Sequence, residues 1–381
     1  MIFKNYKNKK KLIIYHAAPY FNTWPRKWKL HELENYGFDV ELWSTEEIFW
    51  KIENIKAASS GSSSYLYKEL KIFKIKDLIS LEKKVSELDN KAILCIMSLG
   101  TLDNNHYNNP ELDIFNKHKI KYVIHHTSPY QAVLSAWFKL KFNIKLLEKR
   151  IRNKKKKPSL IIGSGSEGRK QVFKIYSNSF KYQSMPSPNV SWFKEKPIIK
   201  DKIIVYIEEA LNLSPDATLF GQNRPVNDLE SFYNRLNDVF EKIENWTNLK
   251  VVVAASGKYH YNLNPFKNRT IIYEKTLNLI QHAEFVIGHR SLALEQAIVN
   301  YKPLLFLKDK TFSKTSIKSV DIYSKVYGRK PIWTNQLTKK IFLKNAYVNK
   351  KFYNEIINKY LKEVNTEGAF VDNFVSALQK L

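Results

Sequence analysis

A strand-like run, Phe285–Gly288, ends in the polar corner His289, Arg290 and Ser291, and a helix-like stretch follows from Leu292 to Asn300. The N–H groups at the start of a helix are unpaired and carry a partial positive charge, so they favour anions such as phosphate. Ser291 can cap the helix or bind a phosphate oxygen, while His289 and Arg290 supply further donors. The pattern therefore indicates a phosphate site, although an ordinary capped strand–helix unit without a ligand fits it equally well.

Carboxylates follow another apolar run in the same half of the chain. Glu208 and Glu209 come directly after Ile203–Ile207, and Asp216 lies a few residues further on. A carboxylate at a strand end can act as a general base or as a nucleophile. Adjacent residues on a strand point to opposite sides, so only one of the pair is expected to face a substrate. Exposed acids at the start of a helix remain an alternative.

Histidines follow strand-like runs in the first half of the chain. His16 begins a loop that reaches Tyr20, and His125 and His126 end the run that starts at Tyr122. Such loops can contact a substrate, but plain polar turns explain them as well. No Asp, Glu or Cys lies at metal-ligand spacing from the paired histidines, so we expect no metal site.

The elements that carry these residues alternate between strand-like and helix-like patterns. This alternation predicts an α/β fold with parallel sheets. A segment with three prolines between about Gln183 and Lys202 is the best candidate for a domain boundary. We therefore predict two Rossmann-like domains, residues 1–190 and 191–340, which face each other across a cleft, and a helical tail, residues 341–381. The glycine-rich run 163–168 matches a tight strand-to-helix turn better than a nucleotide-binding loop.

Composition limits the possible partners. The net charge is +27, from 63 Lys and Arg against 36 Asp and Glu. An excess of this size fits anionic substrates, an anionic membrane face or nucleic acid, and also a lysine-rich chain with solvated faces. Because no nucleic-acid-binding signature is present, we expect no nucleic-acid partner.

Location follows from other features of the sequence. The apolar stretch near the start is too short for a signal peptide core, and no run approaches the length of a membrane span. The single cysteine, Cys95, lies in an apolar run and cannot form an internal disulfide. We expect a cytoplasmic protein, with peripheral contact to the inner face of the cytoplasmic membrane left open. Two aromatic and basic stretches, 24–28 and 136–142, suit such contact, but a buried aromatic face explains them better.

The region from Lys202 to Leu307 resembles the C-terminal domain of GT-B glycosyltransferases that build bacterial surface polysaccharides. The resemblance rests on the order of several motifs: the acidic pair, then Pro215-Asp216, then Glu274-Lys275-Thr276, and finally the corner followed by Lys302-Pro303. The order is similar to that of Kdo transferases and bacterial sialyltransferases, which use CMP-activated sugars. Where that pattern has His-Pro, this chain has Ala255-Ser256-Gly257-Lys258, so a hydroxyl and a cation stand in for it.

The resemblance implies a role for each group of residues. It implies that the acidic residues are catalytic: Glu208, Glu209 and Asp216. It implies that hydroxyl and basic residues bind the nucleotide and donor sugar: Ser256, Lys258, Lys275, Thr276, His289, Arg290 and Ser291. Acceptor or cleft contacts would come from His16, Tyr20, His125 and His126. No metal or other cofactor is implied.

The predicted function is a glycosyltransferase in the biosynthesis of a bacterial surface glycan, such as lipopolysaccharide, O-antigen or capsule. The preferred donor is a CMP-activated ulosonic acid of the Kdo or sialic acid type, and the acceptor is a glycan or a lipid-linked sugar. Two alternatives stay open. One is a UDP-sugar transferase or nucleotide-sugar epimerase of the same fold, and the other is a non-catalytic basic binding protein.

Overall fold

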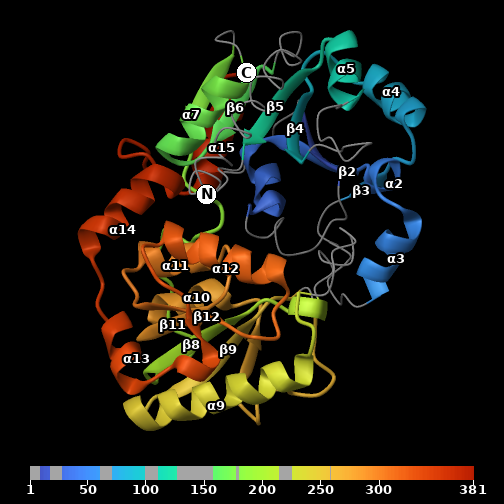
Figure 1. Ribbon diagram of the computed structural model, residues 1–381. Helices are drawn as coiled ribbons and strands as arrows, with labels where there is room; N and C mark the ends of the chain where they lie inside the picture. The colour runs from blue at the N-terminus through green and yellow to red at the C-terminus, as the bar shows by residue number, and fades with distance from the viewer. Residues whose placement is uncertain are drawn as a thin grey trace.

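The chain forms two α/β lobes, each built on a parallel sheet (Figure 1). The structure, a computed structural model, describes residues 9–17, 28–60, 71–98, 110–126, 158–176, 180–213, 225–257 and 259–381. Every strand pairing recorded within the two sheets is parallel. The predicted α/β class, with two Rossmann-like domains, is therefore confirmed.

The first sheet has seven strands in the order β3-β2-β1-β4-β5-β6-β7. Its strands are β1 (Lys10–His16), β2 (Phe38–Ser44), β3 (Ile72–Lys74), β4 (Ile93–Ser98), β5 (Lys121–His126), β6 (Leu160–Gly163) and β7 (Lys181–Ser184). The helices of this part are η1 (Leu30–Tyr36), α2 (Glu46–Phe49), α3 (Ile52–Ser60), α4 (Leu78–Ser86), α5 (Pro110–Lys117) and α7 (Gly165–Ile175). Central strands such as β1 are buried on both faces, as expected for a sheet covered by helices.

The second sheet has six strands in the order β10-β9-β8-β11-β12-β13. Its strands are β8 (Ile203–Glu208), β9 (Lys250–Ala255), β10 (Ile271–Tyr273), β11 (Phe285–Gly288), β12 (Leu304–Lys308) and β13 (Ile332–Trp333). Its helices are η4 (Leu211–Leu213), α9 (Leu229–Thr247), α10 (Thr276–His282), α11 (Leu294–Val299), α12 (Lys314–Val326), η5 (Thr334–Gln336) and α13 (Lys339–Asn345). Local signals fix several helix ends, and Asp228, for example, caps α9 by accepting from the N–H of Ser231 at 3.0 Å.

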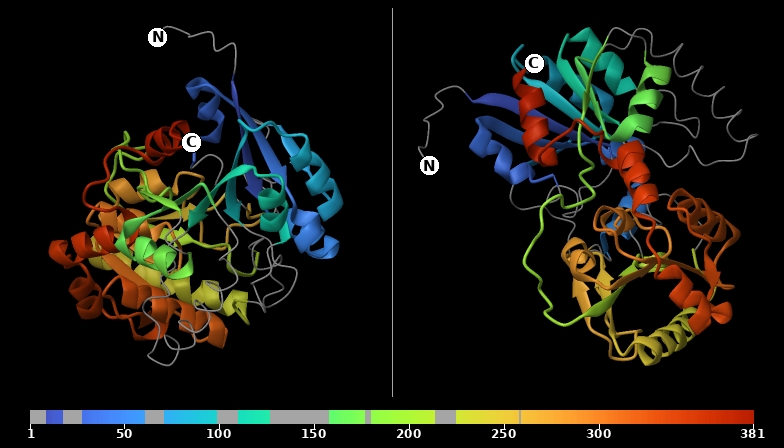
Figure 2. Two further views of the ribbon diagram at one scale, coloured as in Figure 1. Left: turned by 90° about the horizontal axis from the view of Figure 1, so that it is seen from above. Right: turned by 90° about the vertical axis from the view of Figure 1, so that its left-hand side faces the viewer.

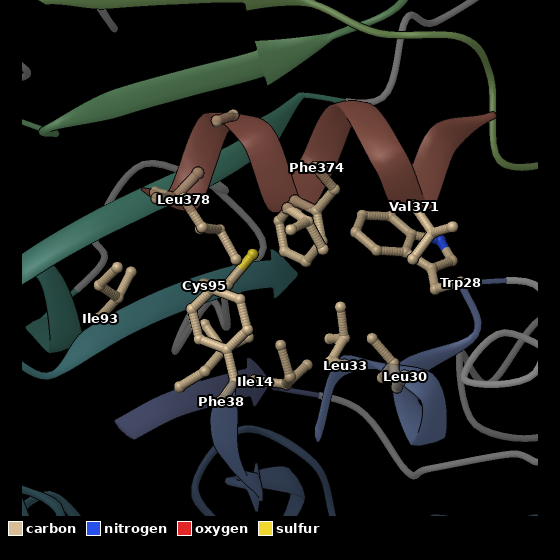
Figure 3. Packing of buried hydrophobic residues seen from close by; sticks show 14 of the residues in the cluster. Ile14, Trp28, Leu30, Leu33, Phe38, Ile93, Cys95, Val371, Phe374 and Leu378 are labelled. Atoms are coloured by element: carbon tan, nitrogen blue, oxygen red, sulfur yellow. The ribbon is translucent and has the colours of Figure 1, made fainter. Parts of the chain in front are cut away.

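The C-terminal tail returns to the first lobe (Figure 2). It consists of α14 (Lys350–Ile356), the π-helical turn η6 (Ile357–Leu361) and α15 (Phe370–Gln379). Residues of α14 and η6 belong to the core of the second lobe, whereas α15 packs into the core of the first. Figure 3 shows Phe374 and Leu378 pointing from α15 toward Cys95 on β4. The tail is thus shared between the two cores, and the boundaries near residues 190 and 340 stay a prediction.

Two sequence features have clear structural roles. Cys95 is fully buried among apolar side chains, and burial raises the pKa of its thiol. The glycine-rich run forms the turn from β6 into α7, as predicted. Gly165 has a φ of +67°, and a β-carbon there would collide with the backbone of Lys359 in η6. Glycine is therefore required because the tail passes directly over this turn.

Candidate active site

The carboxyl edge of the second sheet brings the predicted residues together. The chain starts this sheet at β8, adds β9 and β10 on one side, and then returns to add β11, β12 and β13 on the other. The topological switch point therefore lies between β8 and β11, which pair directly. Ligands of open parallel sheets bind beyond the carboxyl ends of the strands at such a point. Glu208 ends β8, Glu209 follows it and the polar corner follows β11, so all of them lie at the switch point.

Glu208 ends β8 and turns toward Tyr261, in the connection from β9 to β10. Its side chain is buried, and its Oε1 accepts hydrogen bonds from the Tyr261 hydroxyl at 2.7 Å and from the Ala210 N–H at 2.7 Å. Its Oε2 is also buried, but it has no hydrogen-bond partner among the described residues. Burial raises the pKa of Glu208 to about 7; the charge of Glu209 acts in the same direction and the hydrogen bond from Tyr261 opposes it. A carboxyl that titrates near neutral pH suits acid–base chemistry.

Glu209 points the other way, toward the polar corner. Its Oε1 accepts a hydrogen bond from the N–H of Arg290 at 2.6 Å, and its Oε2 accepts one from Nε of the same arginine at 3.3 Å. The two side chains are 11% and 24% exposed, so solvent screens the pair only in part. The two acids thus have different partners, and Glu209 fixes the corner against β8.

His289 is not available to a ligand, which corrects its prediction as a phosphate donor. Its ring is buried, Nδ1 donates to the carbonyl of Leu307 at 2.6 Å, and Nε2 accepts from the Tyr206 hydroxyl at 3.0 Å. Since a carbonyl only accepts, these bonds define the neutral ring with its proton on Nδ1. Burial lowers the pKa of His289. The residue holds the corner in place from inside the core.

The remaining corner residues lie nearer the surface. Ser291 does not cap α11; its Oγ accepts from the N–H of Ala293 at 3.2 Å, and the helix begins at Leu294. Arg290, Ser291 and Ala293 are half-buried, and Leu292 is exposed. The N–H groups of Ser291 and Leu292 have no hydrogen-bond partner among the described residues. The corner therefore offers two backbone donors beside a guanidinium group.

The other residues predicted to bind the nucleotide and donor sugar follow β9 and β10, on the other side of β8. Ser256 follows β9 and is half-buried, and a β-carbon on the adjacent Gly257 would collide with the Glu274 side chain. Lys275 is exposed and Thr276 half-buried at the start of α10. All of them lie at the same carboxyl edge as the acidic pair. Asp216, Lys258 and Tyr20 fall outside the described residues.

The histidines of the first sheet lie at its carboxyl edge. That sheet switches direction between β1 and β4, and His16 is the last residue of β1. His125 and His126 end β5, one strand further along. The His125 ring packs edge-on against Trp28, with ring centroids 4.5 Å apart, and Phe370 of α15 lies 6.1 Å away. Burial lowers the pKa of His125 to about 3, and the neighbouring His126 adds to this effect. His16 is thus at the switch point, whereas His125 lies against an aromatic cluster.

Sequence analysis missed two groups at the carboxyl edge of the second sheet. Tyr261 bonds to Glu208 and also to the Tyr233 hydroxyl, at 3.1 Å. Asp309 directly follows β12, and Arg235 of α9 holds it through two hydrogen bonds of 2.6 and 2.9 Å. Burial would raise the pKa of Asp309, but the bonds from Arg235, Thr311 and Thr334 lower it to about 2. The rule that singled out the acidic pair, a carboxylate directly after a strand, also applies to Asp309.

No cluster of three or more His, Cys, Asp or Glu residues suitable for a metal ion occurs among the described residues. Within the same residues, no helix combines the length and the apolar character needed to cross a membrane. The polar groups at the switch point are thus a guanidinium group, two backbone N–H donors and two carboxyl groups.

Comparisons with known proteins extend the fold assignment. No family model matches the chain, and no curated protein matches it in sequence. Among solved structures, UGT89C1 from Arabidopsis thaliana, solved with UDP-L-rhamnose, is 10% identical, with a TM-score of 0.51 over 98% of this chain and 100% of that chain. The calicheamicin glycosyltransferase CalG4 is 10% identical, with a TM-score of 0.50 over 92% of this chain and 93% of that chain. A UDP-GlcNAc 2-epimerase from Methanocaldococcus jannaschii is 11% identical, with a TM-score of 0.47 over 97% of this chain and 100% of that chain.

These likenesses concern the fold. The chain has the GT-B fold, with two Rossmann-like domains, as the resemblance of its second half implied. The fold alone does not define a reaction, because one architecture can carry several activities. The chemistry depends on the side chains at the carboxyl edge of the second sheet.

Proposed function

We propose that the protein is a glycosyltransferase that binds a nucleotide-sugar donor at the β8–β11 switch point and transfers the sugar to a glycan acceptor. The observation that carries the proposal is the hydrogen bond from the Arg290 N–H to Glu209, which joins the two predicted motifs at one place. In sheets of this kind that place is where nucleotides bind.

The corner is proposed to hold the phosphate of the donor. The Arg290 guanidinium and the unpaired N–H groups of Ser291 and Leu292 supply charge-assisted hydrogen bonds to phosphate oxygens. Glu209 is a positioning residue in this proposal, because its two bonds to Arg290 fix the orientation of the arginine. Ser256, Lys275 and Thr276, on the neighbouring strands, extend the site toward the rest of the donor.

Glu208 is proposed as the acid–base group. With a pKa of about 7 it exchanges a proton readily at neutral pH, and its Oε2 has no partner among the described residues. It accepts the proton of the acceptor hydroxyl as the new glycosidic bond forms and the nucleotide leaves. His16, at the switch point of the first sheet, is proposed to contact the acceptor.

The identity of the donor is a finer proposal. The order of motifs in the sequence favours a CMP-activated ulosonic acid, which carries a carboxylate, and the net charge of +27 suits such an anionic donor. UGT89C1 was solved with UDP-L-rhamnose, so UDP is the principal competitor. The same positive charge favours an acceptor at an anionic membrane face, which fits the assembly of a surface glycan.

Thermal shift measurements with CMP, UDP and GDP test the binding part, since a ligand that binds only the native state raises Tm. We expect the largest rise with CMP. Arg290→Ala should weaken nucleotide binding about tenfold or more, because a hydrogen bond to a charged group contributes roughly 1.5–3 kcal/mol. Lys250→Ala is the matched control, since it removes an exposed cation at the amino edge of the same sheet. Stabilisation by UDP alone would exclude the CMP donor, and no response to any nucleotide would contradict the function.

Turnover assays test the chemistry. With Glu208→Gln we expect at least a hundredfold lower kcat and loss of the pH dependence near 7, because general acid–base groups contribute typically 10²–10⁴-fold. Glu209→Gln should instead raise KM. Full activity in Glu208→Gln would show that the buried acid is only structural. Conversion of the free donor without any acceptor would indicate an epimerase, and steeply salt-dependent binding of arbitrary RNA without nucleotide binding would indicate a basic binding protein.

A further inference from the structure

A polar pocket lies where the tail crosses back to the first lobe. Its volume is about 340 Å³, within the range of small-molecule sites. Its walls come from α7, from the edge strand β7, from the segment between η6 and α15, and from α15 itself. The lining residues are Arg169, Tyr182, Gln183, Ser184, Glu363, Asn365, Thr366, Glu367 and Asn373. None of them belongs to the site at the β8–β11 switch point.

Three buried polar atoms of residues that line this pocket have no hydrogen-bond partner among the described residues. They are the hydroxyl oxygens of Tyr182 and Ser184 and Oε1 of Glu363. Tyr182 and Ser184 lie on one face of β7, since alternate residues of a strand point the same way. Their hydroxyls are close enough for Ser184 to affect the pKa of Tyr182, but they form no hydrogen bond of normal geometry with each other. Buried polar groups are normally paired, so three unpaired ones around one pocket indicate a missing partner.

The unpaired atoms define the chemistry of that partner. Burial, aided by the charge of Glu363, raises the pKa of Tyr182, so its hydroxyl stays protonated and can donate. A serine hydroxyl both donates and accepts, whereas an ionised carboxylate oxygen only accepts. The partner must therefore present donors and acceptors close together. Adjacent hydroxyl groups of a sugar or another polyol do so.

Charge argues for a neutral ligand. Arg169 and Glu363 already pair, with Nη1 and Oε2 3.5 Å apart, so their charges compensate each other. A further carboxylate, Glu367, lines the pocket and would repel an anion. The arginine side chain is half-exposed, which places solvent beside the pair.

The surrounding backbone keeps the pocket in shape. A β-carbon at Gly163 would lie only 3.1 Å from the Tyr182 hydroxyl, so glycine leaves room for this hydroxyl. Asn373 donates to the carbonyls of Glu367 and Ala369, which ties the crossing segment to α15. The walls are thus fixed by contacts of their own, independent of the three unpaired atoms.

We propose that this pocket binds a neutral polyhydroxylated ligand, a monosaccharide or a sugar unit of a glycan, through Tyr182, Ser184 and Glu363. The site is separate from the nucleotide site and does not rest on the proposed function. It lies where the tail, which joins the two lobes, passes α7 and β7.

Titration calorimetry of the full chain with glucose, galactose, mannose and N-acetylglucosamine tests the proposal. We expect saturable binding of at least one sugar, in the millimolar range or tighter. Tyr182→Phe and Ser184→Ala each remove one unpaired hydroxyl, so each should weaken that binding at least tenfold while Tm in the absence of sugar stays unchanged or rises. Tyr347→Phe, which removes an exposed tyrosine hydroxyl of the second lobe, should leave binding unchanged.

Three results would overturn the proposal. One is no saturable binding of any of these sugars, and another is sugar binding by Tyr182→Phe and Ser184→Ala that equals that of the unmodified protein. The third is binding of glycine, a zwitterion titrated in parallel, in place of the sugars. Sugar binding that persists in Arg290→Ala and in the presence of CMP would show that the pocket is separate from the nucleotide site. Failure of one of the two proposals therefore leaves the other intact.

Discussion

The carboxyl edges of the two sheets occupy corresponding places in their lobes but differ in chemistry. At the second sheet, two hydrogen-bonded pairs lie at the switch point: Glu208 accepts from Tyr261, and Glu209 accepts from Arg290. At the first sheet, His125 lies against the aromatic rings of Trp28 and Phe370. The topology of a parallel sheet thus determines which strand ends lie at the switch point. The packing around each strand end determines whether a polar side chain there contacts other polar groups or aromatic rings.

Protonation shows the same contrast in a measurable form. Burial raises the pKa of Glu208 to about 7 and lowers that of His125 to about 3, so burial keeps both groups neutral. Between pH 4.5 and 7 the native state holds a proton on Glu208 that the unfolded chain has lost, so stability falls as the pH rises. Between pH 3 and 6.5 the unfolded chain holds a proton on His125 that the native state lacks, so stability rises with pH.

The largest effect is expected for the tail helix α15, which packs against the first sheet and lies beside His125 through Phe370. Phe374 is fully buried between α15 and the first sheet (Figure 3). Phe374→Ala should lower the free energy of unfolding by about 3–5 kcal/mol, because it leaves a cavity in the core. Val364→Ala, at an exposed position of the same tail, should change it by less than about 0.5 kcal/mol. Urea denaturation measures both, and similar values would show that α15 is not part of that core.

The pH dependence of stability tests whether burial raises the pKa of Glu208 at the second sheet. A rise in pKa from 4.5 to about 7 corresponds to about 3 kcal/mol, lost between pH 4.5 and just above 7. Glu208→Gln cannot ionise, so its stability relative to the unmodified protein should increase by up to this amount over the same window. Denaturation midpoints across pH 4–8 measure the effect, with Glu355→Gln, an exposed acid on α14, as the control. A constant difference across the window would mean that Glu208 ionises normally.

The smallest expected effect concerns the hydrogen bonds between Glu209, after β8, and Arg290, in the polar corner. Glu209→Ala removes two hydrogen bonds, whereas Arg290→Ala removes only the side-chain bond, so Glu209→Ala should cost more, about 2 kcal/mol against about 1. A double-mutant cycle should give a coupling free energy of about 1 kcal/mol, measured by chemical denaturation. Additive effects would show that the two side chains do not interact in solution, and the link between the two motifs would then rest on the backbone N–H of Arg290 alone.

Sequence reasoning located much of this site because it used a rule about strand ends. The buried runs before Glu208 and before His289 are long and apolar enough to predict strands, and parallel strands place their carboxyl ends at one edge. The different partners of Glu208 and Glu209 fit the alternation of side chains that the prediction used. The rule failed at His289, because the sequence does not show that Tyr206 and the Leu307 carbonyl occupy both ring nitrogens.

The polar pocket beneath the tail could not be predicted from local patterns. Arg169, Tyr182 and Glu363 come from three distant segments, and no motif joins them. They meet only because Gly165 lets the tail pass close over α7 and because α15 packs on the first sheet. Amphipathic periodicity predicted a helix in the tail but not the lobe against which that helix packs.

The sequence by itself determined the alternation of strands and helices, the two parallel sheets and the strand ends at which polar residues gather. These properties depend on near neighbours in the chain, through hydrophobic periodicity and backbone preference. Only the tertiary structure decided which polar groups are free to bind, which histidines are locked in the core and what pKa each acid has. Those properties depend on burial and on partners far away in sequence, and the same residue type behaves differently in each environment.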